Sequence, residues 1–592
     1  MDKQTAKSRL IARLMMHLLP AQFLLAAVSS VNSIVCSLAA GNLLGAYTMS
    51  AVGLYLPVNM FLNAVVTMLQ GGTAIQSGKY IGKNARDQMQ NAFTLNMIVS
   101  LLFSAVVTMV FLVLGKLNLT HLVTADPGLQ ETFNDYLQGQ AVGVLPMVVG
   151  GQLSAFLSLE NRQKVTTAAT VSCIIVSLFA NLVFLRILNL GAFGLALSTS
   201  VGMWVFFAIQ AAGFFGGQNG YRFSLNLHGL RWNDLGVILK VGFPGAVNFG
   251  YQAVRGMILN RLIQQYAGTD GLSAFAANDA LLRLFWAVPF GMVAVGRMIF
   301  SVSVGEEDRE ALKAAIRAVM CRYIPLMVLI SASVILLAHP LTRLYYRNTS
   351  DPVYTMTVLG FRILPATMPI SVFTLNYACY AQTAGRLRLV HLLSLMNGVL
   401  SVVILSALLL PSMGMAGVDA AHVLSGMLQI IVILIYTCIK KRGLPRCLDD
   451  LMAFPPDFGV PESEWMNLTV RTMEDVITVS RTLEHFCLNR GVDRRRSCFA
   501  ALAMEEMAGN IVRHGFSGNN SRQEAVIRVT RKGNNLILRI RDNGRHFNPV
   551  ERLQMLDPED RISNIGLRLA RRCASEMQYQ SILGLNVLTL RI

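Results

Sequence analysis

Charged residues are scarce over most of this chain. Only 14% of its 592 residues are Asp, Glu, Lys or Arg, whereas a soluble domain usually carries about 25%. None occurs between Arg13 and Lys79, or between Asp419 and Lys440. A membrane-spanning helix needs roughly 20 apolar residues, so each gap has room for at least one. This scarcity excludes a wholly soluble protein and predicts a multi-span membrane protein.

Other features that the sequence lacks narrow the class of protein. The apolar stretches show no period-2 alternation, so we expect helices to satisfy the backbone polar groups in lipid. The nine cysteines show no metal-ligand spacing. No Gly-x-x-x-x-Gly-Lys-Ser/Thr motif is present, which argues against a primary ATP-driven pump. The first apolar stretch is too long for a cleavable signal peptide.

Apolar stretches then give the expected organisation. We predict twelve membrane-spanning helices near residues 15–41, 50–77, 92–115, 134–158, 165–188, 190–216, 236–263, 272–301, 318–338, 354–382, 389–411 and 413–438. Residues 1–216 would form a first six-helix half and residues 217–440 a second, giving an all-α membrane domain in contact with the lipid bilayer.

Basic residues predict the orientation of these helices. They gather after each even-numbered stretch: Lys79, Lys83, Arg86, Arg162, Lys164, Arg222, Arg231, Arg309, Lys313, Arg317, Arg386, Arg388, Lys440, Lys441 and Arg442. Positively charged connections face the cytoplasm, so we expect both termini to be cytoplasmic. The net charge of +18 follows from this bias and from a basic tail, and we expect no nucleic-acid partner.

The membrane part contains an internal repeat. Landmark residues recur at an offset near 223 residues: Pro20 and Pro244, Gly45 and Gly268, Gly82 and Gly305, and Gly191 and Gly414. Two six-helix halves that start on the same side of the membrane are parallel repeats, related by an axis along the membrane normal. Transporters of this design bind substrate between the halves.

Several motifs occur in order along this part: Gly41-Asn-Leu-Leu-Gly45, Gly82-Lys-Asn-Ala-Arg-Asp, Glu160-Asn-Arg-Gln-Lys, Gly191-Ala-Phe-Gly-Leu and Val241-Gly-Phe-Pro-Gly. With these motifs, residues 1–440 resemble the multidrug and toxic compound extrusion (MATE) family. The resemblance implies efflux of a small-molecule substrate by alternating access of the two halves, coupled to H⁺ or Na⁺.

The sequence departs from the family at the residues that serve this coupling. Many relatives carry an acidic residue in the first span, where this chain has Asn32. The seventh span, in which relatives can have a Glu, offers Gln252 and Arg255. The usual carboxylates are therefore absent, and the choice between H⁺ and Na⁺ stays open. The repeat offset pairs Asn32 with Arg255, so we expect these two side chains to face one another across a central cavity.

Charged residues inside the spans are candidates for the substrate cavity. Asp279 and Arg283 are four residues apart and lie on one helix face. With Asn32, Arg255 and Arg362 they would line a cavity suited to an anionic or zwitterionic substrate, because intramembrane charges usually face a cavity or a partner. The alternative is a helix-packing ion pair, with the arginines reaching toward the membrane surface.

The character of the chain changes near Lys440. Residues 441–464 are basic and then Pro-rich, which is typical of an extended linker. Residues 465–592 are enough for one domain and predict an α/β sandwich with helices on one face of a mixed sheet. We expect strands near 468–471, 525–530, 535–541 and 587–592 and helices near 473–489, 493–514 and 564–577.

Polar residues stand at the ends of these elements. Glu506 and Asn510 lie on one helix face; the carboxylate can orient a nucleophile, and the amide oxygen can ligate Mg²⁺. Asp542 follows a strand and can accept a hydrogen bond from an adenine amino group. Gly544 lets the backbone approach closely, and Gly566 precedes a helix whose amides can hold phosphates.

These motifs resemble the histidine-kinase-like (GHKL) ATPase fold, most closely the anti-sigma-factor serine kinases of bacteria. The resemblance implies ATP and Mg²⁺ as cofactors, Glu506 as the catalytic residue, Asn510 as the metal ligand, and Asp542, Gly544 and Gly566 as nucleotide contacts. Asn564 departs from the Gly that the family usually has.

The first hypothesis is a transporter of a bacterial cytoplasmic membrane whose tail binds ATP, or a regulatory protein partner, and controls transport. The alternative is a membrane-tethered anti-sigma-type Ser/Thr protein kinase or switch, with the transporter-like part as its sensor. The sequence leaves the substrate, the oligomeric state and the enzymatic activity of the tail open.

Overall fold

The protein is described from a computed structural model. The structure describes residues 11–24, 26, 44, 46–83, 85–116, 127–160, 162–216, 230–343, 346, 348–455, 458–516, 523–533, 535–555, 565–582 and 585–592.

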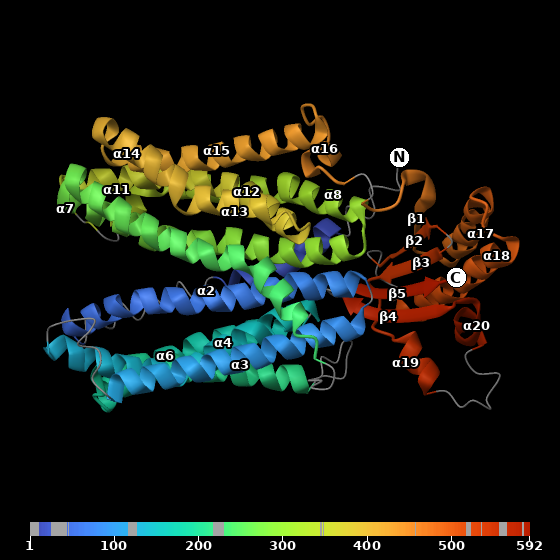
Figure 1. Cartoon of the computed structure of the whole chain (residues 1–592), viewed down its shortest axis with the longest axis horizontal. Coiled ribbons are helices and arrows are strands. Elements are labelled where there is room, and N and C mark those ends of the chain that lie inside the picture. The colour runs from blue at the N-terminus through green and yellow to red at the C-terminus, as the bar shows by residue number, and fades with distance from the viewer. Residues whose placement is uncertain are drawn as a thin grey trace.

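Helices of the membrane part form two bundles (Figure 1). The first bundle contains α2 (Ala46–Gly82), α3 (Arg86–Lys116), α4 (Pro127–Leu159), α5 (Gln163–Leu182) and α6 (Gly191–Phe215). The second contains α7 (Asn233–Gly305), α8 (Arg309–Ala318), α9 (Ile324–Leu336), α10 (Ala338–Arg343), α11 (Pro352–Ile363), α12 (Thr367–Thr383), α13 (Leu387–Leu395), α14 (Ser401–Met413) and α15 (Met415–Lys441).

Within the described residues, ten helical segments are long and apolar enough to cross a membrane. The first predicted span, 15–41, lies mostly outside the described residues, where only the short apolar helix Ile11–Leu24 is seen. The predicted span 236–263 is helical and forms the first part of α7. It carries Lys240, Arg255 and Arg261 and is not among the ten. The count of twelve therefore stays a prediction.

Helix boundaries agree with the repeat offset. The backbone of α7 leaves helical geometry at Gly268, where φ is 65°, so its second part runs back to Gly305 and corresponds to α2 by the offset. Gly191 and Gly414, which the offset also pairs, have φ of 56° and 59° at the start of α6 and α15. Glycine adopts these angles without steric cost, which explains why it recurs at both positions. Gly45 lies outside the described residues.

The two bundles meet where α2 packs against α7. A Cβ on Gly82 would lie 2.4 Å from the carbonyl oxygen of Val302, and one on Gly305 would lie 2.3 Å from that of Lys79. Both positions therefore need glycine, because small residues let two membrane helices approach closely. The contact joins two repeat-related glycines, as expected near an axis that relates the halves.

The C-terminal domain is built on a five-stranded sheet of order β1-β2-β3-β5-β4. Its strands are β1 (Trp465–Val470), β2 (Ala525–Lys532), β3 (Asn535–Asp542), β4 (Glu576–Ile582) and β5 (Leu585–Arg591). Every pairing is antiparallel. The expectation of a mixed sheet is therefore wrong: β3 and β4 run in the same direction, but β5 lies between them and is antiparallel to both.

Helices cover one face of this sheet. They are α17 (Met473–Asn489), α18 (Arg494–Asn510), α19 (Pro549–Gln554) and α20 (Ile565–Cys573). Side chains alternate along a strand, so Leu538 and Ile540 of β3 are buried in the core shared with α17, α18 and α20. Arg539 and Arg541 project from the opposite face. The N-terminus of α17 is closed by a capping box between Thr472 and Asp475.

Most predicted elements of this domain are confirmed. The β2–β3 hairpin turns at Gly533, where φ is 61°. The prediction at 564–577 is wrong beyond Cys573, because β4 begins at Glu576 and pairs with β5. Few apolar residues mark β4 in the sequence, and its pairing with β5 decides its conformation instead of local preference.

The linker is less extended than its prolines suggested. Leu448–Met452 forms the short helix α16, and the linker is bound to the second bundle. The Tyr377 hydroxyl donates to the Leu451 carbonyl at 3.0 Å, and Arg386 Nη1 donates to that of Met452 at 2.7 Å. These contacts make the linker part of the second bundle's surface, so a freely extended spacer is wrong over α16.

The C-terminal domain lies at one end of the two bundles, on the right in Figure 1. We call this the domain end. The last residues of α2 and α7 reach it, and Glu306, which follows α7, forms ion pairs with Arg539 and Arg541 of β3. The basic residues Lys79 and Lys83 that follow the second predicted span therefore lie on the same side as the domain.

Candidate functional site

Asp542 is a buried, hydrogen-bonded residue of the predicted nucleotide site. It ends β3 and its side chain is only 4% exposed. Its Oδ1 accepts hydrogen bonds from the Gly544 amide and from Asn586 Nδ2, both at 2.8 Å. Burial raises the pKa of Asp542 to about 6, although both hydrogen bonds favour the charged form. A buried carboxylate held in place by two donors is suited to recognising a polar ligand group.

Asn586 and Tyr579 complete this arrangement. Asn586 pairs with Asp542 across β3 and β5, and its Oδ1 accepts from the Tyr579 hydroxyl at 2.7 Å. Neither residue was among the predicted site residues. The available signal was an asparagine within the mostly apolar strand β5, because a buried polar side chain there needs a partner.

The loop after β3 is held against the end of α18. The Arg545 amide donates to the Gly515 carbonyl at 2.9 Å. A Cβ on Gly544 would lie 2.8 Å from the same oxygen, so glycine permits the close approach. The predicted pair Asp542 and Gly544 is therefore brought together with the turn that follows Asn510.

Glu506 and Gly566 are also brought together. A Cβ on Gly566 would lie 2.0 Å from Glu506 Oε2, so the carboxylate rests against the first turn of α20. The N-terminus of a helix attracts negative charge, which stabilises Glu506 there and makes the same amides suitable for phosphates. Asn564, where the family pattern is broken, lies outside the described residues.

Asn510 is the last residue of α18 and is half-buried. It lies one turn after Glu506, at the edge of the site. Among the described residues, no group of three or more His, Cys, Asp or Glu side chains could hold a metal ion. Mg²⁺ usually takes one or two protein oxygens and completes its shell with phosphates and water, so the single amide oxygen of Asn510 is compatible with Mg²⁺ beside a bound nucleotide.

Charged residues also gather within the second bundle. Asp279 and Arg283 form an ion pair with Nη2 and Oδ2 2.6 Å apart, and both side chains are exposed. Arg255 lies within electrostatic range of this pair and donates to the Asn397 carbonyl at 3.1 Å. His422 of α15, which the sequence analysis did not select, interacts with Arg255 and Asp279. Three of the five predicted cavity residues thus lie within electrostatic range of one another.

The other two are placed differently. Arg362 of α11 lies beside His339, with Nη2 and Nε2 3.2 Å apart, and His339 contacts the Tyr354 hydroxyl. Its described contacts do not join it to Arg255. Asn32 lies outside the described residues, so its pairing with Arg255 stays a prediction.

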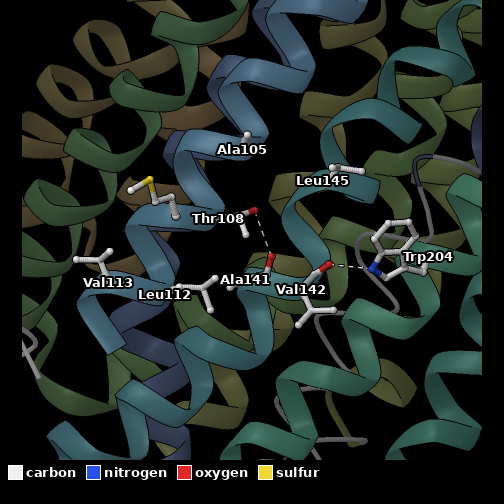
Figure 2. A pocket seen from close by; sticks show the side chains of 9 residues that line it. Ala105, Thr108, Leu112, Val113, Ala141, Val142, Leu145 and Trp204 are labelled. Carbon is white, nitrogen blue, oxygen red and sulfur yellow. Dashed lines mark hydrogen bonds between the residues drawn. The ribbon is translucent and has the colours of Figure 1, made fainter. Parts of the chain in front are cut away.

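A separate hollow of about 730 Å³ lies on the first bundle (Figure 2), whereas these charges belong to the second. It is lined by residues of α3, α4 and α6: Ala105, Thr108, Met109, Leu112, Val113, Ala141, Val142, Leu145 and Trp204. Met109 and Trp204 are exposed hydrophobic side chains, as expected for a surface that faces lipid.

Trp204 has a structural role in this hollow. Its Nε1 donates to the Val142 carbonyl at 2.9 Å, as Figure 2 shows. Pro146 follows four residues later in α4 and has no N–H, so Val142 loses its helical donor. In lipid a carbonyl needs a partner within the protein, and Trp204 supplies it.

Replacing Trp204 by Phe should destabilise the protein by about 1–3 kcal/mol, because the Val142 carbonyl is left unpaired. Thermal unfolding of the purified protein in detergent measures this. Trp232→Phe is the control, since Trp232 is exposed and precedes α7. Equal stability of the two variants would contradict the prediction.

Comparisons with known proteins agree with this architecture. The MatE family model matches residues 20–183 and again 244–408, and the model of the histidine kinase-like ATPase domain matches residues 470–592. The two MatE matches repeat the internal offset. The chain is thus a multi-pass membrane transporter carrying an ATPase-like domain. It belongs to the MatE family, with a C-terminal histidine kinase-like ATPase domain, and this membership implies a small-molecule substrate and ATP binding.

Solved structures support the membrane fold. One similar structure is an outward-facing conformation of a multidrug resistance MATE family transporter of the MOP superfamily, with a TM-score of 0.66, 20% identity, and 71% of this chain and 94% of that chain covered. A crystal structure of MATE in complex with MaD3S is similar with a TM-score of 0.67 and 20% identity, and the match covers 72% of this chain and 95% of that chain. A MOP superfamily transporter from Pyrococcus furiosus, described by a binding pocket of reverse polarity, has a TM-score of 0.64 and 20% identity. That match covers 71% of this chain and 94% of that chain. Comparison with curated proteins gave no match.

Proposed function

We propose that this chain is a secondary transporter of a bacterial cytoplasmic membrane that exports a small molecule by alternating access of its two halves. Its C-terminal domain binds ATP with Mg²⁺ in the cytoplasm and regulates transport. The observation that carries the proposal is the buried Asp542, fixed by Gly544 and Asn586, in a domain that is itself bound to the transporter. Regulation needs both a ligand site and a physical contact with the regulated part.

In this proposal Asp542 accepts a hydrogen bond from the adenine amino group, and Gly544 lets the nucleotide approach the backbone. Asn510 contributes an oxygen to Mg²⁺. The N-terminus of α20, at Gly566, holds phosphates, and Glu506 polarises the attacking group if the domain transfers or hydrolyses the γ-phosphate. Mg²⁺, when bound, would neutralise phosphate charge.

We propose that Arg255, Asp279 and Arg283, together with Asn32 and Arg362, belong to the substrate cavity. Asp279 and Arg283 are exposed and Arg255 lies within their electrostatic range, which favours a cavity over a purely packing role. Two arginines against one aspartate make the described part of this cluster basic. A basic cavity prefers an anionic or zwitterionic substrate.

The C-terminus should lie in the cytoplasm. The reason is that the basic connections after the even-numbered spans face the cytoplasm, and Lys79 and Lys83 lie at the domain end. A reporter fused after Ile592 that is active only in the cytoplasm measures this directly. A periplasmic signal would contradict both the span count and the access of the domain to ATP.

Arg255→Ala should reduce transport of anionic substrates by about tenfold or more while leaving cationic ones less affected. An arginine within a span is retained at a cost of at least about 2.5 kcal/mol, which a ligand or partner offsets. Uptake into proteoliposomes across anionic, neutral and cationic compounds measures the preference. Arg261→Ala, an exposed residue of the same helix, is the control. Unchanged uptake of every class would leave Arg255 with a structural role.

The proposal as a whole is tested with the purified full-length chain in proteoliposomes. We expect transport that responds to ATP on the domain side, and transport without this response after residues 465–592 are deleted. If calorimetry detected no ATP binding to the full-length chain, the proposal that the C-terminal domain binds ATP would be wrong. A chain that phosphorylates a partner protein but transports nothing would favour the kinase alternative.

A further inference from the structure

A group of buried charges joins the C-terminal domain to the membrane part. Glu306 and Asp308 stand between α7 and α8, and their side chains are 3% and 1% exposed. Arg528, Arg539 and Arg541 reach them from β2 and β3, and these side chains are 10–14% exposed. Buried charges almost always have partners; here each side of the interface supplies the partners of the other.

Each of the two carboxylates pairs with two arginines of the sheet. Arg541 binds Glu306 Oε2 through Nη2, and its Nη1 lies 3.7 Å from Asp308 Oδ2. Arg539 Nη1 lies 3.4 Å from Glu306 Oε1, and Arg528 pairs with Asp308 Oδ1. Burial opposes ionisation of Glu306, but the charges of Arg541 and Arg539 outweigh it and lower the pKa of this carboxyl. The pairs that Glu306 forms are therefore ionic at neutral pH.

This charge group lies where the two bundles meet. Glu306 follows Gly305, and a Cβ on Gly82 of α2 would come within 2.7 Å of the Glu306 amide nitrogen. Val587 of β5, the cross-strand partner of Arg541, is buried in the apolar cluster that contains Ile81 of α2 and Val302 of α7. The domain thus packs into the same apolar cluster as the ends of α2 and α7 and is paired with the segment that follows α7.

We propose that the C-terminal domain is a latch that keeps the two bundles together at the domain end. The row of Arg528, Arg539 and Arg541 holds the segment Glu306–Asp308 in place, and this segment in turn holds α7 against Gly82 of α2. Separation of the bundles at this end, which alternating access requires, then needs the domain to shift. The inference rests on the proposed function and gives the mechanism of its regulation.

The latch is directly connected to the proposed nucleotide site. Arg541 and Asp542 are consecutive residues of β3, and their side chains lie on opposite faces of the sheet. A change in the position of β3 on nucleotide binding would therefore move the arginine that holds Glu306. Allosteric control needs this kind of shared element, whose position both sites influence.

Hydrogen exchange of the full-length chain in lipid nanodiscs, without nucleotide, tests the latch. In a double variant, Arg539→Gln with Arg541→Gln, we expect amides of residues 76–83 of α2 to exchange at least tenfold faster than in the wild type. These residues are unchanged and belong to the first bundle, so faster exchange there reports loosening of the bundle contact. Arg591→Gln is the matched control, because its ion pair with Glu576 is exposed and lies within the domain.

A second variant that lacks residues 465–592 removes the latch entirely, in case other contacts keep the double variant docked. It should show the same increase at 76–83. Wild-type exchange at 76–83 in both variants would overturn the proposal. Exchange at 525–542 in the double variant shows whether the domain remains folded. The readout needs neither ATP nor transport, so failure of the latch and failure of the proposed function are distinguishable.

Discussion

Asp542→Asn should weaken ATP binding by about 1–3 kcal/mol, a factor of roughly 5 to 150. Oδ1 of Asp542 accepts from two donors, Gly544 and Asn586. An amide in its place offers one acceptor oxygen and one NH₂ group. Either a protein donor or the adenine amino group would then face another donor. Calorimetry of the full-length protein with ATP and Mg²⁺ measures the loss.

Glu505→Gln is the control for removing a carboxylate. Glu505 precedes Glu506 in α18 and its side chain is exposed, so the variant should bind ATP as the wild type does. If Asp542→Asn also bound ATP with unchanged affinity, Asp542 would not be the adenine contact, and the buried site would need another explanation.

The contribution of Asp542 to the stability of the C-terminal domain should fall as the pH rises from about 4 to about 7. Burial raises the pKa of Asp542 from its ordinary value to about 6, so the folded domain prefers the protonated carboxyl. The stability from this preference is fully present below the unfolded pKa, near 4, and is lost as the pH passes through 6. The loss amounts to about 3 kcal/mol at most, at 1.36 kcal/mol for each pKa unit.

Labelling of Cys487 measures this effect, because Cys487 is buried in the core of the domain and reacts only when the domain opens. The difference in opening free energy between the wild type and Asp542→Asn, taken at each pH, removes the pH dependence of the labelling chemistry. A difference that stays constant from pH 4 to pH 7 would contradict the prediction.

Much of the membrane part could be predicted because lipid imposes a simple rule on sequence. Runs without charge marked most helices, and the paired glycines Gly82 and Gly305 marked the repeat. The span 236–263 was harder to define, since Lys240, Arg255 and Arg261 interrupt its apolar character. In the tail, the helical spacing of apolar residues defined α17 and a turn glycine defined the β2–β3 hairpin, because both signals depend on neighbouring residues.

What the sequence did not reveal depends on distant contacts. The direction of the strands and the existence of β4 follow from pairing with β5, which local preference does not encode. Asn586 gains its significance only from lying opposite Asp542. The pairing of Arg541 with Glu306 joins residues far apart in the chain. From the sequence alone, Arg541 and Glu306 would both be interpreted as ordinary surface charges.

The linker bound along the second bundle has a consequence for how the domain behaves in a cell. Because α16 is fixed near the domain end, a C-terminal domain that dissociates from Glu306 and Asp308 stays within a short distance of them. Its effective concentration there is on the order of millimolar. A docking affinity of only about 10 μM would then keep roughly 99% of the molecules docked. The strength of docking is thus a property of each single molecule, unaffected by how many copies the membrane contains.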